Sequence, residues 1–399
     1  MSEPLRVRAA VLREPGTPLR VETVLLEPPR EGEVLVRLAA AGVCHSDLHL
    51  VEGHLRGRRT PTVLGHEGAG VVESVGAGVT RVAPGDRVAL CFMPSCGTCA
   101  PCRAGRGNLC EPASEASFGG TMLDGTTRLR LEDGTPLMHF LSVACFAERC
   151  VVPAASVVPL PPALPLWQAS LVGCAVVTGF GAVRNAARVQ PGDAVCIVGC
   201  GGVGLQVVAA ARLARADPIV AVDVQPERLE LARGRGATHV LDAAEGEPAA
   251  AILELTDGGV HHAFEVVGRP ESIRLAWQTL RPGGTVVVVG LVPDGVEAAV
   301  PAIDFLSEKS LRGSFYGSGN PAQEIGDLGA LAAEGRLDLA ATISHTTDLA
   351  GLEEAFERLR RGQGARTVIV LDRELAGIAD GTTSASPDAF PAFGRASRS

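Results

Sequence analysis

Short apolar runs, broken by glycine and proline, fill the first part of the chain. Residues 33–43, 68–79 and 82–90 read EVLVRLAAAGV, GAGVVESVGAGV and VAPGDRVAL, in which aliphatic residues alternate with polar ones or follow a tight turn. Runs of this kind, bounded by turn residues, are typical of β-strands. The pattern therefore predicts a mainly β domain over residues 1–177.

The pattern changes at about residue 178, where apolar strands and helices begin to alternate. Strands are predicted over 193–199, 218–224, 238–242, 261–268 and 283–290, and helices over 203–215 and 226–236. This alternation indicates a parallel, doubly wound sheet. The predicted fold class is α/β, with a doubly wound domain over 178–317 next to the β domain.

The last part of the chain turns helical and then closes with a strand. Helices are predicted over 325–337 and 349–362, and a strand over 365–371, so that 318–371 forms a return segment. Residues 372–399 are rich in Ser, Thr, Pro, Gly and Ala and lack periodicity. We expect this tail to be poorly ordered.

The composition of the chain is typical of a globular protein, and we expect that protein to reside in a reducing compartment. The chain has 399 residues, of which 46% are hydrophobic and 20% charged, and its net charge is −9 without a basic patch, so nucleic acid is not an expected partner. The N-terminus lacks the apolar region of a signal peptide, and no uninterrupted apolar run reaches the ~18–20 residues that span a bilayer. We expect a cytoplasmic protein without a membrane partner. Its 11 cysteines then favour metal or redox use over disulfides.

A glycine motif opens the first predicted helix of the doubly wound domain. In VCIVGCGGVG, Gly199, Gly201 and Gly204 have G-x-G-x-x-G spacing directly after an apolar strand. Gly199 allows the tight turn, Gly201 lets the backbone approach a pyrophosphate, and Gly204 permits close packing of helix on strand. The motif alone is weak evidence in a glycine-rich chain. The strand, loop, helix and next strand in this order make a dinucleotide site the stronger interpretation.

An acid ends the strand that follows this motif. Asp223 closes PIVAVD, where a carboxylate binds the ribose hydroxyls and repels a 2′-phosphate. NAD is therefore predicted over NADP. Arg228 could flank the adenosine ribose or be a solvated helix charge.

Four cysteines lie close together in one loop rich in glycine and proline. They are Cys96, Cys99, Cys102 and Cys110, in CGTCAPCRAGRGNLC. Two C-x-x-C units suit the tetrahedral sulfur ligation of structural zinc. An iron–sulfur cluster fits the same ligands, and disulfides are disfavoured by the expected compartment.

Side chains able to bind metal or move protons crowd into the segment CHSDLHL. They are Cys44, His45, Ser46, Asp47 and His49. Taken alone, the segment also fits a turn with a buried thiol and solvated polar groups.

These motifs together resemble the medium-chain, zinc-dependent alcohol dehydrogenases over about residues 5–371. The matching segments are GVCHSDLH, LGHEGAG, the four-cysteine loop, GCGGVG and VDV. The resemblance implies a GroES-like catalytic domain with a structural-zinc lobe over 1–177. It also implies a Rossmann NAD-binding domain over 178–317 and a return segment, 318–371, that completes the catalytic domain.

The resemblance further implies a catalytic zinc besides the structural one, and so two zinc per chain. Its ligands would be Cys44, His66 and Cys174, with a fourth position left open, as catalytic zinc requires. Glu67 matches an acid that can approach the metal. Asp47 matches the carboxylate that orients the ligating histidine. Ser46 and His49 match a proton relay that passes through the cofactor ribose.

Contacts to cofactor and substrate are implied as well. The cofactor set is Gly199, Gly201, Gly202, Val203, Gly204, Asp223, Arg228, His45 and Arg366. His45 and Arg366 match positions that face the pyrophosphate, and Phe92 and Phe140 match positions that line the substrate pocket. The five cysteines outside both metal sets are interpreted as packing residues.

The implied reaction is reversible hydride transfer between NAD and a primary or secondary alcohol. The apolar pocket favours medium-chain or aromatic alcohols, and zinc serves as the Lewis acid. Two further enzymes remain open: an S-(hydroxymethyl)thiol dehydrogenase, and a nicotinoprotein that keeps NAD bound. The non-enzymatic alternative is a zinc-lobe binding protein that has lost catalysis.

Residues 118–141 resemble an insert found in the dimeric branch of the family and in its thiol-dependent formaldehyde dehydrogenases. We therefore expect a homodimer, with a tetramer as the alternative. Glutathione is disfavoured as the thiol. Leu55 and Arg56 stand where the glutathione enzymes carry an acid, and no arginine closely follows Cys110. A different thiol, such as mycothiol, stays open.

Overall fold

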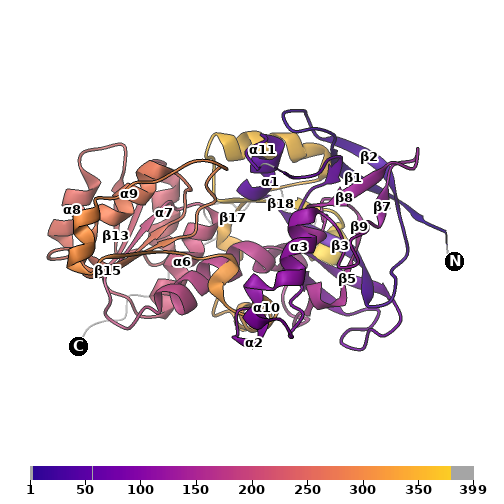
Figure 1. Cartoon of the computed structure of the whole chain (residues 1–399), viewed down its shortest axis with the longest axis horizontal. Coiled ribbons are helices and arrows are strands. Elements are labelled where there is room, and N and C mark those ends of the chain that lie inside the picture. Colours follow the sequence, from indigo (N-terminus) through magenta and orange to yellow (C-terminus); the bar gives the residue numbers. More distant parts are fainter. Residues whose placement is uncertain (1–2, 56, 379–399) are drawn as a thin grey trace.

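The computed structural model describes residues 3–55 and 57–378, which form a β-rich lobe and an α/β lobe side by side (Figure 1). In the β-rich lobe, five strands close into a small barrel. They are β1 (Leu5–Leu12), β2 (Arg20–Leu26), β4 (Thr62–Val63), β7 (Leu129–Arg130) and β8 (Pro136–His139). The barrel packs an apolar cluster of its own, which includes Val7, Val24 and Leu129.

A second, seven-stranded sheet of the same lobe is built from both ends of the chain. Its strands are β3 (Glu33–Gly42), β5 (Glu67–Val75), β6 (Arg87–Leu90), β9 (Arg149–Pro153), β10 (Val157–Pro159), β17 (Ile343–Thr347) and β18 (Arg366–Val370). β18 pairs antiparallel with β3, with Val368 opposite Gly42. The last strand of the chain thus lies beside one of its first.

The α/β lobe holds a six-stranded sheet in the order β13-β12-β11-β14-β15-β16. Its strands are β11 (Val195–Val198), β12 (Ile219–Asp223), β13 (His239–Asp242), β14 (Val260–Glu265), β15 (Leu280–Val288) and β16 (Ser310–Gly313). Every pairing in it is parallel, and β11 and β12 are buried along their whole length. Helices on both faces of a parallel sheet produce such continuously apolar strands. The doubly wound α/β prediction is confirmed.

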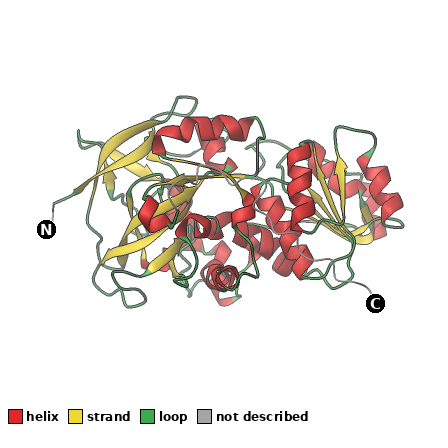
Figure 2. Ribbon diagram, turned by 180° about the vertical axis from the view of Figure 1, so that it is seen from behind, coloured by secondary structure: helices red, strands yellow, loops and turns green. Residues whose placement is uncertain are grey.

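Helices flank this sheet and also occur in the β-rich lobe (Figure 2). Around the sheet lie α6 (Gly202–Leu213), α7 (Pro226–Arg235), α8 (Pro248–Leu255) and α9 (Pro270–Gln278). The others are α1 (His45–Val51), α2 (Ala100–Arg103), α3 (Glu111–Gly119), α4 (Leu166–Ala169), α5 (Val177–Gly181), α10 (Pro321–Ala333), α11 (Leu352–Arg360) and α12 (Arg373–Ala376). Sequence patterning did not predict α3, α8 or α9.

One continuous helical segment, Leu166–Ala187, connects the two lobes. It has a mean hydropathy of 1.6 and is long enough to cross a membrane, but 78% of its apolar window is buried inside the protein. It is therefore a core helix by its surroundings. The domain boundary expected at residue 177/178 falls inside this segment rather than in a loop. Its turn over 172–176 is π-helical, a widening that often marks functional sites.

Part of the predicted disordered tail is folded. Asp372 caps the helix Arg373–Ala376 by accepting a hydrogen bond from Leu375 N, and its carboxylate pairs with Arg37. An aspartate cap satisfies a backbone donor that a helix start leaves unpaired. Residues 379–399 of the tail lie outside the described residues.

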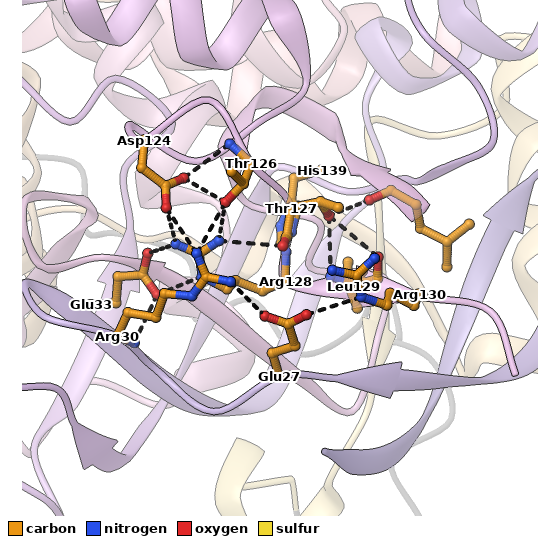
Figure 3. Close-up of polar contacts among 11 residues, drawn as sticks. Glu27, Arg30, Glu33, Asp124, Thr126, Thr127, Arg128, Leu129, Arg130 and His139 are labelled. Carbon is orange, nitrogen blue, oxygen red and sulfur yellow. Dashed lines mark hydrogen bonds and ion pairs between the residues drawn. The ribbon is translucent and has the colours of Figure 1, made fainter. Parts of the chain in front are cut away.

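A buried ionic network ties the 118–141 insert to β3 (Figure 3). The side chain of Arg128 is 1% exposed, and its guanidinium donates to Glu33 Oε2 at 2.9 Å and to Asp124 Oδ2 at 2.7 Å. The Arg128 backbone N–H donates to His139 Nε2 at 3.0 Å. A buried charge needs such partners, because an unpaired one costs several kcal/mol, about 3–5. The network holds the end of β8, which directly precedes Phe140 in the chain.

Candidate active site

Four side chains from separate elements converge at the junction of the two lobes. Cys44 stands just before α1, His66 and Glu67 at the start of β5, and Cys174 in the π-helical turn. Their ligand atoms all lie within 4.8 Å of one another, and all four residues are buried. The structure thus brings together the three residues that the resemblance assigned to catalytic zinc, with the acid beside them.

Asp47 holds His66 in one orientation. Asp47 Oδ2 lies 3.3 Å from His66 Nδ1, and Asp47 Oδ1 accepts the Gly65 N–H at 2.9 Å. Both side chains are almost fully buried. A carboxylate on Nδ1 fixes the tautomer and makes the other ring nitrogen a better ligand.

The donor atoms of this cluster fit a zinc ion. His66 Nε2 is buried and has no hydrogen-bond partner within the described residues. A hydrogen bond from Cys174 lowers the pKa of the Cys44 thiol well below its usual range, so the pair holds one thiolate readily. An imidazole nitrogen and two cysteine sulfurs are ligands that zinc prefers, and three protein ligands leave a position for substrate.

Glu67 forms an ion pair with Arg366, the residue that the resemblance implied as a pyrophosphate contact. Arg366 Nη1 lies 3.0 Å from Glu67 Oε1 and donates to the Val43 carbonyl at 2.8 Å. The same guanidinium lies against the start of α6: a Cβ on Gly202 would be 2.0 Å from Arg366 Nε. Arg366 therefore touches both the ligand cluster and the glycine-rich loop.

The glycine loop has the geometry that its spacing predicted. Gly199 has a φ of +99°, which L side chains rarely adopt, and a Cβ on Gly204 would lie 1.9 Å from the Gly199 carbonyl oxygen. A Cβ on Gly201 would meet nothing within 4 Å, so the backbone there faces open space. Val203 follows in the first turn of α6. The close packing and the open face are what a bound pyrophosphate requires.

Asp223 ends β12 beside this loop. Its Oδ2 accepts the Cys200 N–H at 2.7 Å and its Oδ1 the Gln225 N–H at 2.9 Å. An ionised carboxylate has about four acceptor sites, so two remain for ribose hydroxyls. Arg228 Nη1 is 4.0 Å from Asp223 Oδ2, and its Nε donates to the Gly364 carbonyl. Arg228 is thus a paired, half-buried charge rather than a solvated one.

The predicted relay residues lie along α1. Ser46 Oγ is 3.7 Å from Cys44 Sγ, and His45 is exposed at the first position of the helix. His49 is part-buried and contacts His54, with 3.1 Å between their Nδ1 atoms. Within the described residues no hydrogen bond joins Ser46 directly to His49.

The four-cysteine loop forms a second compact cluster. The Sγ atoms of Cys96, Cys99, Cys102 and Cys110 lie within 4.8 Å of one another, and none forms a disulfide. Backbone N–H groups of Thr98 and Cys99 donate to Cys96 Sγ at 3.4 and 3.3 Å. The Thr98 hydroxyl, which donates to Cys96 Sγ at 3.5 Å, and these backbone bonds together lower the pKa of Cys96 to about 6. Four sulfurs with one already held as a thiolate fit a tetrahedral metal.

The predicted pocket residues Phe92 and Phe140 both pack edge-on against His66, each with ring centroids 5.5 Å away. Phe92 also stacks on Tyr316 at 3.7 Å, and the Tyr316 hydroxyl donates to the Gly173 carbonyl. Sequence analysis missed Tyr316. It is the one tyrosine of the chain, but no motif surrounds it. His54 was missed for the same reason.

The remaining cysteines behave as packing residues. They are Cys91, Cys145, Cys150, Cys196 and Cys200, all buried and unpaired. Burial raises the pKa of Cys91 to about 11 and that of Cys196 to about 12, which keeps both as neutral thiols.

Two family models match separate parts of the chain. Residues 30–162 match the alcohol dehydrogenase GroES-like domain, and residues 202–334 match the zinc-binding dehydrogenase family. An S-(hydroxymethyl)glutathione dehydrogenase of Escherichia coli O1:K1 is 37% identical over 368 residues, which cover 92% of this chain and 100% of that protein.

Two solved structures resemble this chain in both fold and sequence. An alcohol dehydrogenase zinc-binding domain protein from Burkholderia ambifaria has a TM-score of 0.88 at 36% identity, covering 93% of this chain and 100% of its own. Benzyl alcohol dehydrogenase from Acinetobacter calcoaceticus has a TM-score of 0.87 at 32% identity, with 92% and 100% covered.

The fold and the site define a two-domain dehydrogenase with a GroES-like domain and a Rossmann domain. The chain belongs to the medium-chain, zinc-dependent alcohol dehydrogenase family. It is an oxidoreductase whose cofactors are zinc and a nicotinamide adenine dinucleotide. This excludes the alternative of a zinc-lobe binding protein without catalysis.

Proposed function

We propose that the protein catalyses reversible hydride transfer between NAD and a primary or secondary alcohol. This proposal rests on the position of Arg366, which contacts Glu67 in the ligand cluster and Gly202 in the glycine loop. Because one guanidinium spans both, a dinucleotide on the loop would hold its reactive end near the cluster. An alcohol beside Phe92 and Phe140 would then lie between the reactive end of the dinucleotide and the ligand cluster.

Each residue has a role in this proposal. Cys44, His66 and Cys174 would hold zinc, which supplies a Lewis acid that lowers the pKa of the substrate hydroxyl. Asp47 orients His66, and Ser46 is the first acceptor of the substrate proton. His49 receives that proton by way of the cofactor ribose and passes it toward solvent.

The structural zinc would be held by the four-cysteine loop, and NAD would be chosen over NADP by Asp223. The backbone N–H groups of Cys200 and Gln225 donate to the two oxygens of this carboxylate, which is therefore held in place. A 2′-phosphate would face a fixed negative charge there.

A second candidate is an S-(hydroxymethyl)thiol dehydrogenase, favoured by the relatives that carry that name. The hydroxymethyl group of such an adduct is itself a primary alcohol, so the same residues would serve. A nicotinoprotein is the third candidate, and dinucleotide that remains bound after gel filtration would identify it.

The decisive experiment is oxidation of a panel of alcohols, with NADH formation followed by its absorbance. Octanol, benzyl alcohol and formaldehyde mixed with glutathione or with mycothiol represent the candidates. Activity with none of them, in protein that contains about two zinc per chain, would contradict the proposal.

We also propose that the protein is a homodimer that pairs through β16. This strand is one of the two edge strands of the six-stranded sheet, and all of its residues are exposed. Next to it lie exposed apolar side chains, with Ile303 69% and Leu306 81% exposed. An open sheet edge beside apolar surface pairs readily with a second chain.

A further inference from the structure

The one tyrosine of the chain lies at the junction of the two lobes. Tyr316 begins a short turn, Tyr316–Ser318, that follows β16 of the α/β lobe, and the residue is only 2% exposed. It packs in the large apolar cluster that also contains Leu90, Phe92 and Cys174. A side chain that follows the α/β sheet in the chain is thus buried among residues of the active site.

The Tyr316 hydroxyl bridges two segments of this site. It donates to the Gly173 carbonyl at 2.5 Å and accepts the Phe92 N–H at 3.4 Å. Burial raises the pKa of Tyr316 well above its usual range, so the hydroxyl keeps the one proton that it can donate. Gly173 directly precedes Cys174 in the same π-helical turn. The hydrogen bond therefore holds the backbone next to a proposed zinc ligand.

The backbone at Gly173 is also held from a second direction. A Cβ on Gly173 would lie 2.2 Å from the Leu90 carbonyl oxygen, so this backbone packs directly against the end of β6. Gly173 is thus enclosed between β6 and Tyr316. Removing the hydroxyl would leave a buried carbonyl without this partner, which is costly in the interior of a protein.

The Tyr316 ring supports an aromatic residue of the same cluster. It stacks on Phe92, with ring centroids 3.7 Å apart and planes inclined by 29°. Phe92 in turn packs edge-on against His66. Rings in contact restrain one another, because a close-packed interior leaves them little free space. Phe92 is therefore held between Tyr316 and the ligand His66.

Contacts from two other segments fix the turn that carries Tyr316. Its φ is +50°, a conformation that L side chains adopt only where the surroundings enforce it. Asn185, in the helical segment that connects the lobes, donates to the Gly317 carbonyl at 2.8 Å. Asn108, in the four-cysteine loop, donates to the Phe315 carbonyl at 2.8 Å. The place of Tyr316 is thus specified by the fold itself.

From these contacts we propose that Tyr316 is a positioning residue of the active site, which holds Cys174 through its hydroxyl and Phe92 through its ring. It acts through these two residues and not on the substrate. The inference rests on the proposed alcohol dehydrogenase activity and adds a residue on which the geometry of that site depends.

Tyr316→Phe tests the hydroxyl and keeps the ring. It should weaken the binding of one of the two zinc ions by about tenfold, the low end of the effect of groups that orient metal ligands. It should lower kcat by a similar factor and leave KM for NAD unchanged. Competition with a coloured chelator measures the zinc affinity, and steady-state kinetics separate kcat from KM. Unchanged affinity for both zinc ions would overturn the proposal.

The matched control removes a buried hydroxyl from the α/β lobe. Thr279 is fully buried and donates to the Ala276 carbonyl at 2.8 Å. Thr279→Val should lower the midpoint of thermal unfolding, as Tyr316→Phe does, yet leave zinc affinity and kcat unchanged. An equal loss of zinc affinity in Thr279→Val would show a general effect of stability and would also overturn the proposal.

Tyr316→Leu removes the ring as well as the hydroxyl. Because Phe92 then loses the ring stacked on it, KM for benzyl alcohol should rise by up to about tenfold, the equivalent of one aromatic pair. Tyr316→Phe should leave that KM near the wild-type value. The same KM in both variants would contradict the role assigned to the ring.

A measurement on the unsubstituted chain needs neither turnover nor a variant. Since the chain has one tyrosine, fluorotyrosine labels Tyr316 alone. Its fluorine NMR signal should shift when a chelator removes the catalytic zinc, because Gly173 and Phe92 contact both the label and the ligands. A signal that does not move would overturn the proposal, even if Tyr316→Phe misfolds. Wild-type protein that oxidises no alcohol would instead contradict the proposed function, and the NMR signal and zinc affinities would still decide the role of Tyr316.

Discussion

His49 and His54 face each other across one turn of chain, with 3.1 Å between their Nδ1 atoms and 5.3 Å between their ring centroids. His54 is also 3.5 Å from Glu52, which pairs with Arg360 of α11. The proposed relay therefore ends in a pair of histidines at the surface, and burial with the neighbouring His54 lowers the pKa of His49.

Water or buffer should be able to replace His49 at the end of the relay. His49→Gln should lower kcat by about tenfold, below the usual contribution of a general base, because water or buffer can take the proton. Raising the concentration of imidazole buffer should restore part of that rate. Inactivity that no buffer relieves would mean that His49 contacts metal or substrate directly. His54→Gln, as a comparison, should retain more activity than His49→Gln.

Cys44 and Ser46 should separate metal binding from proton transfer. Cys44→Ala should abolish turnover and remove about one zinc per chain, because two protein ligands seldom retain zinc. Ser46→Ala should keep both zinc ions yet lower kcat by at least about 100-fold, since the substrate proton loses its first acceptor. Zinc is measured by atomic emission on both variants. Full metal content in Cys44→Ala would contradict its assignment as a ligand.

The four-cysteine loop should be structural. Cys99→Ala should lower zinc content by about one ion and the free energy of unfolding by about 3 kcal/mol or more, the size typical of losing a metal clip. Thermal denaturation and metal analysis test this. Cys150→Ala, a buried thiol outside both clusters, is the control and should keep its zinc. A Cys99→Ala protein with unchanged zinc would show that the loop holds none.

Cofactor choice should follow Asp223. Asp223→Gly should raise KM for NAD by about tenfold, the loss of one good charged contact, and should improve NADP relative to NAD. Removing the carboxylate would leave Arg228, 4.0 Å away in the wild type, to meet a 2′-phosphate. Adding Arg228→Gln should then cancel the gain in NADP. Wild-type protein that uses both dinucleotides equally would refute the assignment.

Association should depend on the surface beside β16. Leu306→Asp should convert the dimer to a monomer, because a charge in an apolar interface is costly to desolvate. Light scattering after gel filtration measures the mass. Leu123→Asp changes an apolar side chain that is 50% exposed in the insert, and should leave the dimer intact. A Leu306→Asp protein that remains dimeric would place the interface elsewhere.

Local spacing let the sequence predict features whose chemistry depends on neighbours along the chain. The glycine loop was predictable because turn, open face and helix packing all arise within Gly199–Gly204. The thiols of the zinc lobe could be grouped because Cys96 to Cys110 lie in one loop. The doubly wound sheet followed from the alternation of strand and helix. Patterning failed for α3, α8 and α9, which are only eight or nine residues long, and for the helix that crosses the expected domain boundary.

Tertiary structure decided every relation between residues distant in sequence. Nothing local to LGHEGAG shows that Asp47 fixes the His66 tautomer, and family resemblance alone had linked the two. Arg366 reaches Glu67 only because β18 pairs with β3 and carries the end of the chain back to its beginning. Sequence spacing specifies contacts within a turn or a loop, whereas contacts across lobes depend on how sheets and helices pack, and the substrate end of this site is built from such contacts.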